Sequence, residues 1–342
     1  MKKTNTSRRF FLNLMGQSLL YTSLPTLAAN NAAIAEAKLF DRSGLAFGTT
    51  IKLTLAAQSG QQADAAFEQA FTEIEAVQQA ASLFRPHSEI SQLNRNGVLK
   101  QPSTILQELL QVAAQVSTMS RGAFDITVQP LWLKLDQQAR QSGNARLDAA
   151  TLSQYRQLID WHAVQTGSNE IRLSKPGMGI TLNGLTQGYA ADRVAAILKR
   201  NGIEHAFLDT GEINMMGHKP NGRDWVAAIQ DPRHPNQYVT GVSHFQGSLS
   251  TSGDYEYFWD KQHQQHHILD PHSGTSPTEL ASVTVATANG AIADGLSTAI
   301  MVLGSQEGMK LIKQTEGVEA FMIRKDGSVI SSAGFPKRNL KG

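Results

Sequence analysis

Asp294 and Thr298 have the spacing that most directly suggests chemistry. They are four residues apart, near the start of an apolar stretch that we expect to be helical. Residues four apart share one helix face, so the carboxylate and the hydroxyl would lie one turn apart. Both are hard oxygen ligands of the kind that Mg²⁺ shares with substrate phosphates. From spacing alone, the more common explanation is an exposed aspartate near a helix start and a threonine that bonds back to its own helix.

Three other segments combine glycine with polar residues in ways that suit ligand contact. Asn183–Asp192 brackets a predicted turn with glycines and then opens a helix, whose start offers free N–H groups and a positive dipole end to a phosphate. Arg121–Thr127 places a glycine, which lets backbone approach a ligand closely, before an aromatic residue and an acid. Asp209–Glu212 directly follows a predicted strand. These segments predict an anion or metal site without naming its ligand.

His267 is a candidate proton acceptor, because the unperturbed pKa of histidine, about 6.5, lies near neutrality. It lies in the segment His266–Pro271, which follows the polar segment Ser250–Tyr255. The chain contains 10 histidines, and His263 lies close by. A surface or packed histidine is therefore the alternative interpretation.

Hydrophobic periodicity predicts the elements that position these residues. Apolar residues alternate with polar ones over 49–55, as in a half-buried strand, and recur every three or four residues over 62–82, as in an amphipathic helix. Ser103 is a suitable N-cap for a second helix, and a third runs over 186–200, with two basic residues in its last turn. Further strands are predicted at 205–209, 225–230 and 281–287, and further helices at 291–303 and 306–315.

The order of these elements favours an α+β fold with mixed or antiparallel sheets and flanking helices. Strands and helices mix without a regular βαβ rhythm, which argues against a Rossmann sheet. No G-x-G-x-x-G follows a strand, and the chain has no P-loop. The polar segments Asp136–Asn144 and Asp231–Tyr238 are predicted to be surface insertions.

Composition excludes several classes of function. With 41% hydrophobic and 18% charged residues, the chain of 342 residues is typical of a folded globular protein. The formal net charge is +2 and no basic run occurs beyond the extreme N-terminus, so nothing predicts nucleic-acid binding. The absence of cysteine excludes thiolate catalysis, zinc–thiolate sites, iron–sulfur clusters and a lipoprotein anchor.

Residues 1–29 have the layout of a signal peptide. Basic residues precede an apolar stretch from Phe10 to about Leu27, and small residues follow it. Arg8 and Arg9 followed by Phe-Phe-Leu are typical of the twin-arginine signal, which exports folded proteins. An ordinary secretory signal and a basic anchor helix are the alternatives. We therefore expect a signal peptide at 1–29, a single functional domain at 30–342 and a periplasmic location.

Eight segments, taken in order, resemble the ApbE family of FAD:protein FMN transferases. Each is weak alone, but their shared order over nearly the whole mature chain makes chance similarity improbable. They are Ala46–Thr49, Phe84–Asn94, Gly122–Thr127, Gln187–Asp192, Gly211–Glu212, Thr251–Tyr255, His267–Pro271 and Ala293–Thr298.

The resemblance implies a T-fold-like α+β domain that holds FAD in a cleft with Mg²⁺ beneath the pyrophosphate. Asp294 and Thr298 would bind the metal together with the backbone carbonyl of Gly184. His267 and Asp270 stand where the family keeps residues needed for activity. Contacts to FAD would come from Phe47, Phe84, Ala123, Phe124, Asp125, Thr181, Gln187 and Ile268.

The implied reaction is a phosphoryl-type transfer. A Ser or Thr hydroxyl of a partner flavoprotein attacks the FMN phosphorus and AMP leaves, with positioning and charge stabilisation as the enzyme's main tasks. A partner anchored in the membrane, with its acceptor site outside the cytoplasm, fits the export signal. Two alternatives remain: an FAD pyrophosphatase, in which water replaces the hydroxyl, and a non-catalytic flavin carrier or assembly factor.

Three positions depart from the usual family pattern. Thr181 and Gln187 stand where relatives often carry charged residues, and Thr210 replaces a frequent glycine. The changes remove charge near the flavin and the metal. They resemble the family branch associated with nitrous-oxide respiration, whose members carry twin-arginine signals.

Overall fold

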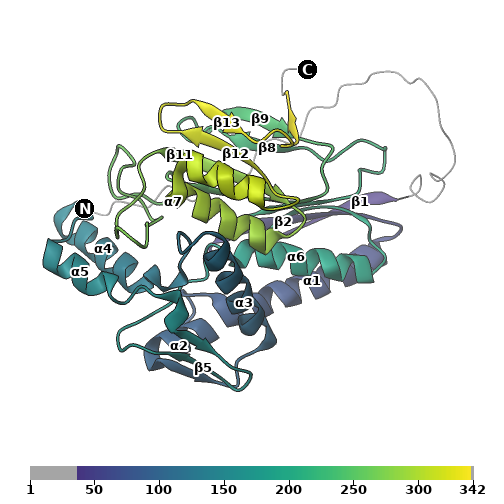
Figure 1. The fold of residues 1–342 in the computed structure, drawn as a ribbon. Helices are drawn as coiled ribbons and strands as arrows, with labels where there is room; N and C mark the ends of the chain where they lie inside the picture. The colour runs from purple at the N-terminus through teal and green to yellow at the C-terminus, as the bar shows by residue number, and fades with distance from the viewer. Residues whose placement is uncertain (1–36, 340–342) are drawn as a thin grey trace, which may run out of the picture.

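The computed structural model describes residues 37–339, and its centre is an eight-stranded sheet (Figure 1). Every pair of neighbouring strands in it is antiparallel. In spatial order the strands are β1 (Lys38–Ala46), β2 (Thr49–Ala57), β6 (His205–Asp209), β7 (Ile213–Met216), β10 (Gly247–Gly253), β11 (Leu280–Thr287), β12 (Glu319–Arg324) and β13 (Val329–Ser331). The predicted signal peptide at 1–29 lies outside the described residues.

Two three-stranded sheets accompany the large sheet. One has the order β14 (Lys337–Arg338), β9 (Tyr238–Val242), β8 (Ala227–Gln230), and the other β3 (Val98–Lys100), β5 (Glu170–Leu173), β4 (Val164–Thr166). The first encloses a hydrophobic cluster with one face of the large sheet, to which Trp225 and Phe321 both contribute. The predicted α+β class with antiparallel sheets is therefore confirmed.

Helices cover the opposite face of the large sheet. α1 (Gly60–Ala81), α6 (Thr186–Arg200) and α7 (Gly290–Gln314) pack side by side there, and α3 (Thr104–Met119) packs on α7 (Figure 1). The shorter helices α2 (Glu89–Asn96), α4 (Gln129–Ser142) and α5 (Ala149–Arg156) lie farther from the sheet. The main hydrophobic core lies between α3, α6, α7 and the sheet.

Local sequence signals set the helix ends. The Ser103 side chain accepts the N–H of Leu106, which confirms the predicted N-cap of α3. Asn289 caps α7 in the same way through the N–H of Ile292. The two helices predicted at 291–303 and 306–315 form the one element α7, with a break at Gly304, whose φ of 76° is readily adopted only by glycine.

The polar segment Asp136–Asn144 lies mostly on the surface, as predicted, but it is the end of a helix and its first residue is buried. Most of it belongs to α4, and Asp136 is buried, where it accepts hydrogen bonds from the Tyr257 hydroxyl and the Trp259 indole. The buried Asp136 thus anchors a helix face that is otherwise exposed and rich in glutamine. Asp231–Tyr238 is mainly a loop between β8 and β9, as predicted.

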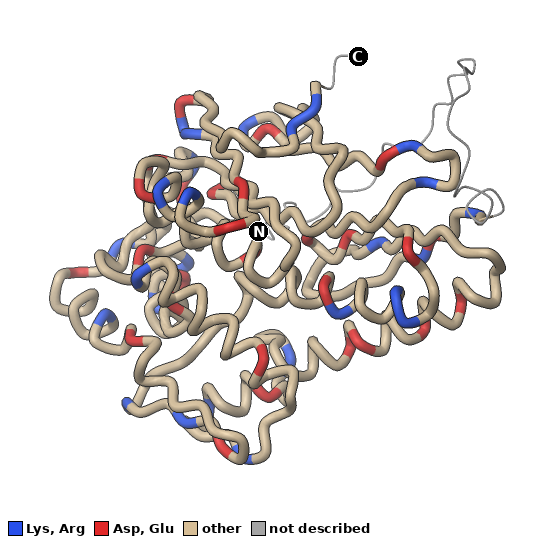
Figure 2. The backbone as a smooth tube through the Cα atoms, turned by 45° about the vertical axis from the view of Figure 1, so that its right-hand side comes forward, with Lys and Arg blue, Asp and Glu red and all other residues tan. Residues whose placement is uncertain are grey.

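Charged residues of both signs are intermixed over the molecule, without a basic stripe (Figure 2). Among the described residues, no helix has the length and apolar character needed to cross a bilayer.

A buried ion-pair cluster holds the long segment between β10 and β11. Asp254 is fully buried and accepts two hydrogen bonds from Arg233, at 2.7 and 2.8 Å, while the Lys325 ammonium lies 3.4 Å away. This cluster ties the loop 231–238 and the end of β12 to the segment that carries His267. A buried acid with two cationic neighbours is a strong anchor because its removal strands their charges.

We expect Asp254→Ala to lower the free energy of unfolding by about 3–5 kcal/mol, the usual cost of breaking a buried pair. Asp64→Ala is the matched control, since it removes the exposed partner of Arg42 and is expected to cost less than about 1 kcal/mol. Urea denaturation at pH 7 measures both. Equal losses for the two variants would contradict the anchoring role of Asp254.

Candidate active site

The starts of α6 and α7 meet backbone to backbone. A Cβ atom added to Gly188 would lie 2.1 Å from the carbonyl oxygen of Gly290, and one added to Gly290 would lie 2.5 Å from the carbonyl oxygen of Gly188. Such distances are below van der Waals contact, so only glycine fits at either position. The two glycines thus allow the helix starts to approach closely.

Two carboxylates cross this contact, one from each helix. Asp294 on α7 accepts the N–H of Gly188 on α6 at 3.1 Å. Asp192 on α6 accepts the N–H groups of Gly290 and Ala291 on α7, at 2.8 and 3.1 Å. Each helix start is therefore capped by an acid of the other helix, and both acids are fixed in place.

These hydrogen bonds between the two helix starts bear on the predicted phosphate site at the start of α6. The start of α6 was expected to offer free N–H groups to a phosphate. The N–H of Gly188 is bonded to Asp294, and that of Thr186 is bonded to the Leu182 carbonyl. The Gly188 N–H therefore orients a carboxylate, and neither of these two N–H groups is left to bind a phosphate.

Thr298 lies one turn after Asp294 on α7 and joins the same region. Its hydroxyl is 3.0 Å from the Ser252 hydroxyl at the end of β10. A Cβ atom added to Gly184 would lie 3.0 Å from the Thr298 hydroxyl oxygen and 3.3 Å from the Phe124 ring. The structure thus brings the three predicted metal ligands, Gly184, Asp294 and Thr298, to the junction of α6 and α7.

The electrostatics of this junction favour a cation. The pKa of Asp294 is raised to about 7, mainly by burial and to a smaller extent by the Asp192 carboxylate, while the Gly188 N–H acts in the opposite direction. Burial also raises the pKa of Glu212 well above its usual value, and the Asp294 carboxylate adds to this effect. Two buried acids that repel each other are expensive to ionise unless a cation lies between them.

The donor set fits a hard divalent cation. Within residues 37–339, no three His, Asp or Glu side chains form a group able to hold a metal by themselves. A cation at the junction would therefore draw on few carboxylates, with hydroxyl, backbone and substrate oxygens as the other ligands. Mg²⁺ is commonly bound in this way, with one or two carboxylates and substrate phosphates.

Several predicted flavin contacts surround the same junction. The Phe124 ring lies against Gly184, and the Thr181 N–H donates to the Ile126 carbonyl next to that segment. The Gln187 carbonyl accepts the Thr210 hydroxyl, and its side-chain amide covers Gly211. Thr181 and Gln187, which stand where relatives often carry charged residues, thus both lie near this junction.

The other predicted contacts differ in their exposure. The Phe47 side chain is half-buried and packs on the core, and its N–H donates to the Gln78 side chain. Ala123 and Ile268 are buried, Ile268 within the same core as Phe124. Phe84 is 68% exposed, so its ring is accessible to a ligand from solvent.

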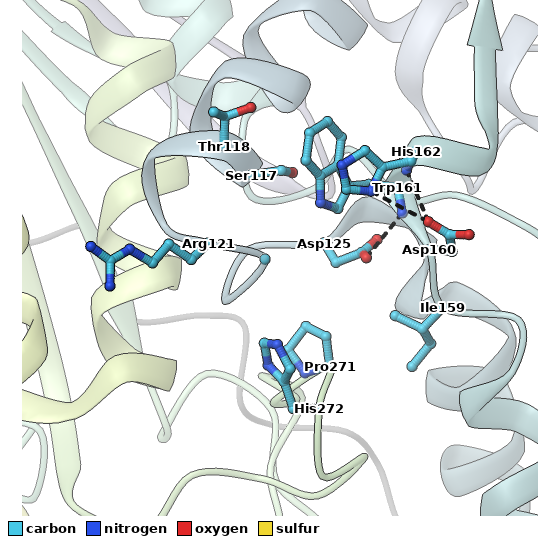
Figure 3. Close-up of a pocket in the computed structure, with 11 residues that line it drawn as sticks. Ser117, Thr118, Arg121, Asp125, Ile159, Asp160, Trp161, His162, Pro271 and His272 are labelled. Atoms are coloured by element: carbon cyan, nitrogen blue, oxygen red, sulfur yellow. Dashed lines mark hydrogen bonds and ion pairs between the residues drawn. The ribbon is translucent and has the colours of Figure 1, made fainter.

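A pocket of about 700 Å³ opens beside the segment that carries Gly122 and Asp125 (Figure 3). Asp125 lines it and accepts the N–H groups of Thr127 and Trp161, while burial raises the pKa of its carboxyl. Trp161 stacks on His162 with 3.7 Å between ring centroids. Since Phe124 faces Gly184 and its neighbour Asp125 faces the pocket, this short segment lies between the pocket and Gly184. The lining residues are Ser117, Thr118, Arg121, Gly122, Asp125, Ile159, Asp160, Trp161, His162, Pro271 and His272.

Sequence reasoning missed most of this lining. Figure 3 shows Pro271 and His272 facing Trp161 and His162 across the opening, with Asp125 between them. His272 lies two residues beyond the predicted Asp270, so extending that segment would have found it. No local spacing marks Trp161 and His162, which reach the pocket from a distant part of the chain.

His267 has the properties of a neutral proton acceptor. Its Nδ1 atom lies 3.1 Å from the Tyr257 carbonyl oxygen, and because a carbonyl only accepts, Nδ1 carries the proton and Nε2 keeps a lone pair. Burial lowers the pKa of His267 below its usual value, so the ring is neutral at pH 7. These features agree with the proton-transfer role expected for His267.

Asp270 has a different set of partners. Its Oδ1 atom accepts the N–H of His272 at 2.9 Å and lies 3.3 Å from the His272 Nδ1. The carboxylate therefore holds the turn that carries His272 into the pocket. Among the contacts of the described residues, Asp270 and His267 are not hydrogen-bonded to each other. This arrangement favours a positioning role for Asp270 over that of a general base.

Comparisons with known proteins agree with this geometry. The ApbE family model matches residues 47–322. The chain is 30% identical to an FAD:protein FMN transferase of Salmonella typhimurium over 271 residues, which cover 75% of this chain and 76% of that relative. It resembles the solved flavin transferase ApbE from Vibrio cholerae, with a TM-score of 0.75, 26% identity and coverage of 87% of this chain and 98% of the other. The apo flavinyl transferase ApbE of Pseudomonas stutzeri gives a TM-score of 0.76, 28% identity and coverage of 87% and 95%.

We expect Gly188→Ala to destabilise the protein by at least about 2 kcal/mol, because its methyl group would overlap the Gly290 carbonyl and force the helix starts apart. Gly60→Ala is the control. Gly60 is the first residue of α1, and a Cβ atom added to it would lie 3.7 Å from the nearest atom, on the Phe40 ring. A change below about 1 kcal/mol is therefore expected. Thermal unfolding measures both, and similar midpoints for the two variants would rule out the proposed close contact.

Proposed function

The chain belongs to the ApbE family, and from this premise we propose that it is an FAD:protein FMN transferase. It moves FMN from FAD to a Ser or Thr hydroxyl of a partner flavoprotein and releases AMP. The observation that carries the proposal is the junction of α6 and α7, where Asp294, Thr298 and the backbone at Gly184 meet.

Mg²⁺ is the metal that this donor set fits best. Asp294, Thr298 and the Gly184 carbonyl would hold it, and its bound charge would neutralise the pyrophosphate of FAD. Because Asp294 caps α6 and Asp192 caps α7, the Asp294 carboxylate is held in one orientation before any ligand binds, and little reorganisation is needed on binding.

The FAD site is proposed to extend from this junction along the Phe124 segment. Asp125 lines the adjacent pocket, and the exposed ring of Phe84 is accessible to a flavin. The proposed FAD contacts are Phe47, Phe84, Ala123, Phe124, Asp125, Thr181, Gln187 and Ile268.

His267 is proposed to take the proton of the attacking hydroxyl. Its Nε2 atom is the one that can accept, because Nδ1 donates to the Tyr257 carbonyl. The lowered pKa keeps the ring unprotonated at neutral pH, as a general base requires. Asp270 supports the reaction indirectly by holding His272 at the pocket.

Incubation of the protein with FAD, MgCl₂ and an acceptor flavoprotein domain tests the proposal. The acceptor should gain the mass of one FMN, and Asp294→Ala should lower the rate by about 100-fold or more because charge stabilisation at the phosphates is lost. Asp64→Ala, on the exposed surface, should leave the rate unchanged.

Two outcomes would argue for other functions. Release of free FMN and AMP without an acceptor would identify a pyrophosphatase. Tight FAD binding without turnover would identify a flavin carrier. Intact-protein mass spectrometry and nucleotide chromatography distinguish all three results in one reaction.

The partner is proposed to be a membrane flavoprotein whose acceptor hydroxyl lies outside the cytoplasm. The support is the twin-arginine signal in residues 1–29, which would export the protein already folded to the periplasm. Folding before export would also allow FAD to bind in the cytoplasm, where flavin is made. The acceptor's position then follows from the enzyme's own location.

Replacing both Arg8 and Arg9 by Lys is expected to keep the protein in the cytoplasmic fraction, since the arginine pair is the feature recognised for folded export. Lys3→Arg is the control and should be exported normally. Immunoblots of periplasmic and cytoplasmic fractions measure the distribution. Unchanged export of the double variant would point to an ordinary secretory signal.

A further inference from the structure

Glu212 is a buried acid that the proposed reaction does not yet use. It lies in the turn between β6 and β7, and its side chain is only 8% exposed. Its Oε2 atom accepts the N–H of Thr251 at 2.9 Å. Among the contacts of the described residues this is the one hydrogen bond of the Glu212 carboxylate, and no Lys, Arg or His forms an ion pair with it.

One chain of contacts places Glu212 beside Thr298. Thr251, which donates to Glu212, is followed by Ser252, and the Ser252 hydroxyl lies 3.0 Å from that of Thr298. Thr251 and Ser252 are neighbours at the end of β10, and they therefore contact Glu212 and Thr298, respectively.

A second chain of contacts places Glu212 beside Asp294. Gly211 packs under the Gln187 side chain so closely that an added Cβ would lie 1.9 Å from the amide nitrogen. The next residue of α6, Gly188, donates its N–H to Asp294. In keeping with these contacts, the charge of Asp294 adds to the effect of burial in raising the pKa of Glu212.

We infer that Glu212 supplies a second carboxylate to the divalent-cation site, beside Asp294 and Thr298. The inference rests on the proposed function and assigns a new residue to the same centre. Without a cation, two adjacent buried acids repel each other with no basic side chain to compensate. With one, both charges are satisfied, and the Thr251 N–H keeps Glu212 oriented toward the centre.

The alternative is that Glu212 only anchors the backbone of β10 through Thr251. Glu212→Gln separates the two roles, because the amide oxygen still accepts the Thr251 N–H while the charge is removed. Glu89→Gln is a matched control. Glu89 also accepts a backbone N–H, from Ser103, but at the start of α2 and outside the site.

The experiment measures Mn²⁺ binding to the purified, FAD-free protein by electron paramagnetic resonance, together with the melting temperature with and without Mn²⁺. For Glu212→Gln we expect an Mn²⁺ dissociation constant at least about 10-fold to 100-fold higher, since that is already the cost of losing a side chain that only orients a metal ligand. Its melting temperature without metal should equal or exceed that of the unchanged protein, because a carboxylate repulsion is gone. Glu89→Gln should bind Mn²⁺ normally.

Asp294→Asn separates the inference from the function on which it rests. If Asp294→Asn loses Mn²⁺ binding while Glu212→Gln binds as the unchanged protein does, the role of Glu212 is overturned and the cation site stands. A lower metal-free melting temperature of Glu212→Gln with normal Mn²⁺ affinity would also overturn it, in favour of the anchoring role. Absence of Mn²⁺ binding in the unchanged protein would overturn the cation site itself.

Discussion

The close contact between the starts of α6 and α7 is the constraint on which the site depends. Gly188 and Gly290 allow the two backbones to touch, and Asp192 and Asp294 each cap the opposite helix. A larger residue at either glycine would separate the helices and move Asp294 away from Gly184. The same contact that packs the core thus orients the carboxylate proposed to bind the metal, so the proposed function and the stability of the fold depend on the same atoms.

Without a bound cation, repulsion between the carboxylates at the junction destabilises the protein. Asp294 and Glu212 are buried, Asp192 is partly buried, and backbone N–H groups, not basic side chains, are the main partners of all three carboxylates. Backbone donors orient an acid without neutralising it, which leaves its charge for a ligand. Asp254 provides the contrast, since Arg233 and Lys325 neutralise it and it serves only as an anchor. A carboxylate that is paired with basic side chains is therefore structural, whereas one that is held by backbone N–H groups keeps its charge for a cation.

Features set by neighbouring residues were predictable from the sequence. The N-cap at Ser103, the span of α6 and the break in α7 depend on contacts within a few positions along the chain. The pairing of Asp294 with Thr298 follows from helix periodicity alone, and the structure places both at the junction. Asp136 shows the limit of this reasoning. Its polar neighbours predicted a loop, whereas two aromatic residues about 120 positions away bury it.

By itself, the sequence determined which residues could bind a metal or move a proton, because residue type and helical spacing are local properties. It also carried the ordered segments that identify the family. Only the tertiary structure decided that Glu212 stands beside Asp294, that Trp161 faces His272 across a pocket, and that Asp270 holds a turn. These relations join segments from different strands and helices. Their distances are set by how the sheet and helices pack, which no spacing along the chain encodes.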